Sequence, residues 1–83
     1  MTSRPGFIGN MKIHYAGVLV DPGRSIRRAR TTEQMTQDEL AEKAGISRSY
    51  LSQLELNRRE APTAVYARIA HAMGYSLDQL WGF

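Results

Sequence analysis

The sequence has no cysteine among its 83 residues, which excludes a disulfide framework and a thiolate metal site. Its two histidines, His14 and His71, lie far apart with no ligand spacing around them, so we expect no metal. The chain also lacks a nucleophile and base at a plausible spacing and a glycine-rich phosphate loop. We therefore expect neither a catalytic site nor a cofactor.

Long apolar runs are missing as well. No stretch approaches the roughly 18–20 apolar residues of a membrane span. Residues 1–10 contain no apolar core followed by a small-residue cleavage site of the secretory kind. From these absences we expect a cytoplasmic protein that makes no membrane contact.

The length and the charge of the chain point to its partners. A chain of 83 residues holds one small core, and cores of about 70–80 residues or fewer usually need a staple or a partner. Dimerisation is therefore expected. Eleven Lys and Arg against eight Asp and Glu give a net charge of +3, carried mostly by arginine, which favours planar anions such as phosphate and guanine edges. Nucleic acid is thus the leading partner.

The character of the chain changes near Asp21. Residues 11–20 are rich in β-branched and aromatic side chains, interrupted by Ala16 and Gly17, a pattern typical of a strand or hairpin. We divide the chain into an N-terminal arm, residues 1–20, and a helical domain, residues 21–83. The arm is expected to be extended or strand-forming and to take part in dimerisation.

Five short helices are predicted after Asp21. Asp21 and Pro22 are typical of the start of a first helix, which runs to about Glu33. Capping boxes predict where the second and fifth helices begin, and the fourth covers about residues 62–73. Thr36 with Glu39 caps the second helix, and Ser76 with Gln79 caps the fifth. Ser47 is the predicted cap of the third helix.

The second and third helices are joined through the short segment Gly45-Ile46-Ser47. Gly45 suits a left-handed turn, and the small Ala41 allows a close helix crossing. Two capped helices with so tight a connection are typical of a helix-turn-helix unit. Leu51 and Leu54 form the predicted inner face of the third helix.

The opposite face of the third helix carries side chains suited to base recognition. Arginine can bond guanine, glutamine can bond adenine, and serine can donate or accept. Groups suited to backbone phosphates surround this stripe. The predicted base-reading residues are Arg48, Ser49, Ser52 and Gln53, and the predicted phosphate contacts are Gln37, Ser47, Arg58 and Arg59. A polar helix face is more often simply solvated, but the helix-turn-helix context favours DNA contact.

Two segments carry a resemblance to a known family. They are Thr36-Gln37-x-x-Leu40-Ala41-x-x-x-Gly45-Ile46-Ser47-x-x-Tyr50-Leu51-Ser52-x-Leu54-Glu55 and Ile69-Ala70-x-x-Met73-Gly74-x-Ser76-Leu77-x-x-Leu80. With these the chain resembles the Cro/C1-type (XRE-like) helix-turn-helix of phage repressors and their bacterial relatives.

The resemblance implies an all-α, five-helix, lambda-repressor-like domain that binds operator DNA as a two-fold dimer. It implies base reading at Arg48, Ser49 and Gln53, a phosphate contact at Gln37, and a structural ion pair between Arg30 and Glu55. In two places the chain departs from the family pattern. Asn57 stands where glycine is common, and the usual proline falls one place later, at Pro62.

These patterns predict a sequence-specific, DNA-binding transcriptional regulator, a repressor or autoregulator on a near-palindromic operator. The alternative is an antitoxin or adaptor whose principal role is protein–protein interaction. This alternative is motivated by the β-prone arm, since an unpaired strand edge can add a strand to a protein partner. An enzyme is not expected.

Overall fold

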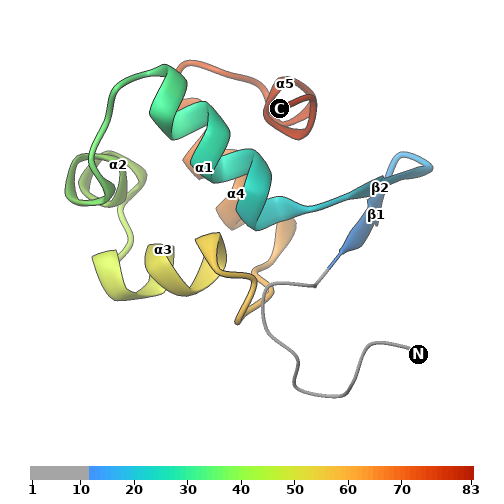
Figure 1. Cartoon of the computed structure of the whole chain (residues 1–83), viewed down its shortest axis with the longest axis horizontal. Helices are drawn as coiled ribbons and strands as arrows, with labels where there is room; N and C mark the ends of the chain where they lie inside the picture. The colour runs from blue at the N-terminus through green and yellow to red at the C-terminus, as the bar shows by residue number, and fades with distance from the viewer. Residues whose placement is uncertain (1–11) are drawn as a thin grey trace.

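The computed structural model describes residues 12–83, and these residues form a two-stranded hairpin followed by five helices (Figure 1). The five helices confirm the fold expected from the sequence. Residues 1–11 of the predicted arm lie outside the described residues. The elements are β1 (Ile13–Tyr15), β2 (Val18–Val20), α1 (Pro22–Thr32), α2 (Gln37–Ala44), α3 (Arg48–Glu55), α4 (Thr63–Ala72) and α5 (Leu77–Trp81).

Of the two forms expected for residues 11–20, a strand or a hairpin, the structure contains a hairpin. β1 and β2 pair antiparallel, with Tyr15 opposite Val18. The two connecting residues, Ala16 and Gly17, have φ values of 52° and 82°, and positive φ at both positions is what a tight two-residue hairpin turn requires. The Tyr15 ring meets the Trp81 ring edge-on at 6.1 Å, so the hairpin packs against α5 of the same chain.

Local hydrogen bonds fix the helix ends where the sequence predicts them. The Thr36 hydroxyl accepts from the Glu39 N–H at 3.0 Å, and the Glu39 carboxylate accepts from the Thr36 N–H at 2.8 Å. The Ser47 hydroxyl accepts from the Tyr50 N–H at 3.0 Å. Gly45 ends α2 in the left-handed conformation, with φ 74°. The turn between α2 and α3 is therefore set at both of its ends.

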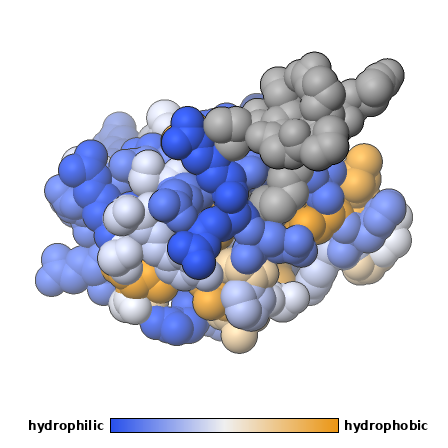
Figure 2. All heavy atoms as spheres, turned by 90° about the horizontal axis from the view of Figure 1, so that it is seen from below, coloured by the Kyte–Doolittle hydropathy of each residue, from blue (hydrophilic) through white to orange (hydrophobic). Residues whose placement is uncertain are grey.

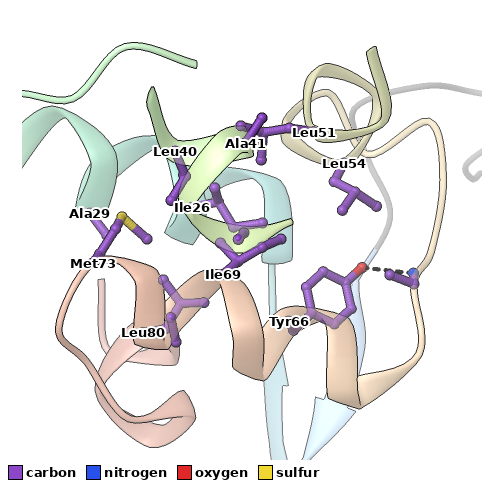
Figure 3. Close-up of a cluster of buried hydrophobic side chains, with 13 residues drawn as sticks. Ile26, Ala29, Leu40, Ala41, Leu51, Leu54, Tyr66, Ile69, Met73 and Leu80 are labelled. Atoms are coloured by element: carbon purple, nitrogen blue, oxygen red, sulfur yellow. Dashed lines mark hydrogen bonds between the residues drawn. The ribbon is translucent and has the colours of Figure 1, made fainter. Parts of the chain in front are cut away.

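All five helices contribute to one core (Figure 3). Tyr66 lies in this core, and its phenol oxygen accepts from the backbone N–H of Ala61 at 3.2 Å. Burial raises the pKa of Tyr66 above its ordinary value. Complete burial of aliphatic side chains from every helix fixes α3 against the body of the molecule. The fully buried aliphatic residues are Ile26, Ala29, Leu40, Leu51, Leu54, Ile69, Ala70 and Leu80.

The end of α3 is joined to the start of α1. Asn57, which follows α3, has φ 57°, so it adopts the left-handed conformation expected there. Its side chain also bridges the two helices, because Nδ2 donates to Asp21 Oδ1 at 2.6 Å and Oδ1 accepts from the Gly23 N–H at 2.9 Å. A Cβ added to Gly23 would lie 2.8 Å from Asn57 Oδ1. Only a glycine fits at this contact.

None of the helices within residues 12–83 is long and apolar enough to cross a membrane.

Candidate nucleic-acid interface

α3 presents its polar face outward because two leucines anchor its other side. Leu51 and Leu54 are completely buried. Arg48 and Ser49 are exposed, while Ser52 and Gln53 are half-buried. The structure thus brings the four predicted base-reading residues together on one helix. Figure 2 views the molecule from the side on which α3 lies in Figure 1, and hydrophilic residues cover most of this face.

The predicted phosphate contacts lie around α3 and differ in how they are held. Ser47 is exposed, and its hydroxyl oxygen caps α3. Arg58 is exposed beyond the end of α3. Arg59 folds back along the helix, because its Nη1 donates to Gln53 Oε1 at 3.3 Å and its guanidinium carbon lies 5.2 Å from the centre of the Tyr50 ring. Arg59 therefore lies beside a predicted base-reading side chain.

Gln37, the remaining predicted phosphate contact, is bonded to a buried ion pair. The Glu55 carboxylate accepts from Arg30 Nε at 2.7 Å and from Arg30 Nη2 at 2.9 Å. It also accepts from Gln37 Nε2 at 3.0 Å. The Glu55 side chain is 2% exposed and that of Arg30 is 20% exposed. The structure thus brings Arg30 and Glu55 together, and it places Gln37 Oε1 3.5 Å from Arg48 Nε.

Electrostatics favour the charged form of Arg30. The hydrogen bond to the Glu55 carboxylate raises the pKa of Arg30, against the opposing effect of partial burial. Arg30 Nη1 also donates to the Met35 carbonyl at 3.1 Å. Carboxylate and guanidinium meet through two parallel hydrogen bonds, the geometry that best suits both groups. The C-terminal end of α3 is thereby held against α1.

Two arginines that hold this interface carry no signal in the sequence. Arg68 of α4 donates to the carbonyl groups of Ala44 and Gly45 at 2.8 and 3.0 Å, and so satisfies the end of α2. Arg27 donates to the backbone carbonyl of Glu55. A surface arginine in a helix is usually solvated, and only the tertiary structure shows which carbonyl it reaches.

Within residues 12–83 no group of three or more His, Cys, Asp or Glu side chains is arranged to hold a metal ion. What the arrangement can do is donate and accept hydrogen bonds along one helix with arginines at its rim. Major-groove base edges flanked by phosphates present a complementary pattern.

Comparison with known proteins gives matches over this same region. A family model described as helix-turn-helix matches residues 26–80. The immunity repressor protein of Bacillus phage phi105 is 35% identical over 60 residues, which cover 72% of this chain and 42% of that protein. The chain therefore spans less than half the length of this curated relative.

Solved structures match with similar coverage. The clp gene regulator ClgR from Corynebacterium glutamicum is similar with a TM-score of 0.68 and 36% identity, over 70% of this chain and 62% of that one. The restriction-modification controller protein C.Esp1396I, solved as a tetramer in complex with its natural 35 base-pair operator, gives a TM-score of 0.68 and 27% identity. That match covers 72% of this chain and 79% of the controller protein.

Proposed function

Because the chain belongs to the XRE-type helix-turn-helix family, we propose that it is a sequence-specific, DNA-binding transcriptional regulator that acts as a repressor or autoregulator. One observation carries this proposal. α3 is anchored by two completely buried leucines, Leu51 and Leu54, and turns a polar face with exposed Arg48 and Ser49 away from the core. A helix presented in this way fits the major groove of duplex DNA.

Each side chain of the interface has a role in this mechanism. Arg48 and Gln53 read bases by paired hydrogen bonds, and Ser49 and Ser52 read neighbouring base edges. Contacts to backbone phosphates set the position of α3 in the groove without reading sequence. The residues assigned to phosphates are Gln37, Ser47, Arg58 and Arg59.

The operator is near-palindromic and the protein binds it as a homodimer. A two-fold dimer places its recognition helices about 34 Å apart, in successive major grooves. One relative is an immunity repressor and one structural neighbour was solved in complex with its operator, and both support this mode of action. Repression is steric, because a dimer on its operator excludes the polymerase.

The hairpin is the surface we assign to self-association. Its residues Val18 and Leu19 are 60% and 58% exposed. Exposed apolar side chains of this size on a small protein favour burial against a partner. α5 lies beside the hairpin through the contact of Tyr15 with Trp81, so one interface can include both elements.

Selection of bound sequences from random duplex DNA tests the proposal, together with the mass of the free and bound protein. A two-fold symmetric motif and a dimeric complex are the expected results. Enrichment of no sequence at physiological salt, where sequence-independent binding is weak, would contradict the regulator function.

Two single substitutions separate base reading from phosphate contact. Arg48→Ala should cost about 1–3 kcal/mol on the selected operator and relax the preference at one base pair. Arg58→Ala should weaken binding to all sequences alike. It should also reduce the steepness of the plot of log binding constant against log salt concentration by about one. Equal losses on operator and unrelated DNA for both variants would contradict base reading by Arg48.

A second candidate function is protein–protein interaction, as an antitoxin or an adaptor. The observation that favours it is the same exposed apolar pair on the hairpin, Val18 and Leu19, because a short strand with a free edge can also pair with a strand of another protein. Copurification of a stoichiometric partner from the source cells would favour this function. Tight operator binding by the protein alone would count against it.

A further inference from the structure

Two acceptors from the start of α2 approach the same N–H group of Arg48. Arg48 Nε lies 3.5 Å from Gln37 Oε1 and 3.6 Å from Asp38 Oδ1. The orientation of the Gln37 amide is set by chemistry, because the Glu55 carboxylate only accepts hydrogen bonds and so must face the amide nitrogen. The amide oxygen is then turned toward Arg48.

The terminal nitrogens of Arg48 are left for an external partner. A guanidinium group carries five N–H donors in one rigid plane, one on Nε and four on the two terminal nitrogens. Within residues 12–83 the terminal nitrogens of Arg48 form no hydrogen bond, and the side chain is 64% exposed. Two parallel donors with this geometry match the O6 and N7 acceptors of guanine in the major groove.

We propose that Asp38 is a positioning residue for base recognition, which holds Nε of Arg48 and so directs its two terminal nitrogens at a guanine. The inference rests on the proposed function, since it assigns the base that Arg48 selects in the groove. Asp38 itself touches no base. Its contribution is to restrict the rotamers of Arg48, which is long and otherwise free to reach phosphates as well as bases.

The charge of Asp38 gives this role a distinctive signature. A carboxylate that is 73% exposed near the DNA-facing surface repels phosphates and lowers the affinity for any duplex. Removal of this charge should therefore strengthen binding to unrelated DNA. If Asp38 also positions Arg48, the same removal weakens the preference for guanine, so general affinity and selectivity change in opposite directions.

Asp38→Asn is the test variant, and Glu42→Gln is its matched control. Glu42 lies one turn later on α2, is exposed, and forms no side-chain hydrogen bond or ion pair within the described part of the chain. Both substitutions remove one exposed negative charge. Asp38→Asn should lower the melting temperature by about 1–8 °C, because it removes one favourable charge from the first turn of a helix.

The measurement uses the operator obtained by selection from random duplex DNA. The base pair read by Arg48 is the one whose preference disappears in Arg48→Ala. This pair is replaced by each alternative pair and, separately, its guanine is replaced by 7-deazaguanine, which lacks the N7 acceptor. Dissociation constants are measured for wild type, Asp38→Asn, Glu42→Gln and Asp38→Asn combined with Arg48→Ala.

Asp38→Asn should reduce the preference for guanine about 1.4- to 5-fold, the range that exposed ion pairs span, and reduce the penalty for 7-deazaguanine. It should also strengthen binding to unrelated duplex. Glu42→Gln should strengthen unrelated binding and leave the preference unchanged. In the Arg48→Ala background, Asp38→Asn should still strengthen binding to unrelated duplex.

Two results would overturn the assignment. They are an unchanged guanine preference in Asp38→Asn and a pair read by Arg48 that contains no guanine on the contacted edge. Failure of the wild-type protein to select any sequence is a separate outcome, because it overturns the proposed function before the variants are compared.

Discussion

Glu55→Gln tests whether the buried ion pair holds the domain together. The Glu55 carboxylate accepts three hydrogen bonds, two from Arg30 and one from Gln37. A glutamine has nearly the same shape, but its amide has one oxygen and an NH₂ group that can only donate. The substitution therefore places a donor against donors and leaves the Arg30 charge without a counter-ion.

The expected loss follows from the burial of both groups. Removal of one member of a buried ion pair costs about 3–5 kcal/mol. Arg30 is 20% exposed, and the amide oxygen of glutamine still accepts one bond, so we expect about 2–4 kcal/mol. A domain of this size loses about 4–8 °C per kcal/mol. The melting temperature should accordingly fall by about 8–30 °C.

Urea and thermal denaturation followed by far-UV circular dichroism measure this loss. The protein concentration must be held constant, because association stabilises the folded state by mass action. Glu42→Gln removes the same charge from an exposed position on α2 and should change the free energy of unfolding by less than about 0.5 kcal/mol. This control separates the buried contact from the change in net charge.

A loss below about 1 kcal/mol for Glu55→Gln would refute the reasoning, because that is the effect of an exposed pair. The combined variant Arg30→Leu with Glu55→Leu provides a second test. It removes both charges and should recover most of the lost stability, since no uncompensated buried charge remains. A combined variant as unstable as Glu55→Gln would show that the unpaired charge is not the cause.

Three further substitutions have expected outcomes. Gly23→Ala should destabilise the domain by about 1–3 kcal/mol in urea denaturation, because the new methyl group would collide with the backbone carbonyl of Glu55; an unchanged midpoint would contradict this close contact. Burial raises the pKa of Tyr66, so the stability that it contributes is complete below pH about 10 and lost above it, as the unfolded phenol ionises first. Tyr66→Phe should make the fall of the free energy of unfolding between pH 9 and 11 shallower, as measured by urea denaturation at each pH. The variant also loses the hydrogen bond that the Ala61 N–H donates to the phenol oxygen. Ala16→Gly should slow hydrogen exchange of the hairpin amides, because Ala16 has φ 52° and glycine adopts that conformation without steric cost; faster exchange would count against it.

Much of the fold could be predicted from the sequence because its signals are local. The Thr36 and Glu39 capping box involves residues three apart, and the left-handed Gly45 follows directly from the helix that it ends. The same holds for α3, where the spacing of Leu51 and Leu54 determines which side faces the core. Exposure of Arg48 and Ser49 then follows from their positions on the helix.

The contacts that assemble the interface could not be predicted in this way. Arg68 bonds carbonyls more than 20 residues away, and Gln37, taken from the sequence as a phosphate contact, bonds Glu55 through its amide nitrogen. Hydrogen-bonding capacity can be read from a sequence, but the partner depends on how the helices are placed. The contact of Arg48 with Asp38 has the same origin.

The bridging amide of Asn57 has a consequence for protein engineering. Glycine, which the resemblance to the family makes the expected residue at this position, would adopt the same left-handed backbone, yet it has no side chain to bond Asp21 and Gly23. A sequence averaged over the family would therefore restore the local conformation and lose a link between two helices. Stabilisation by consensus substitution should leave this position as it is.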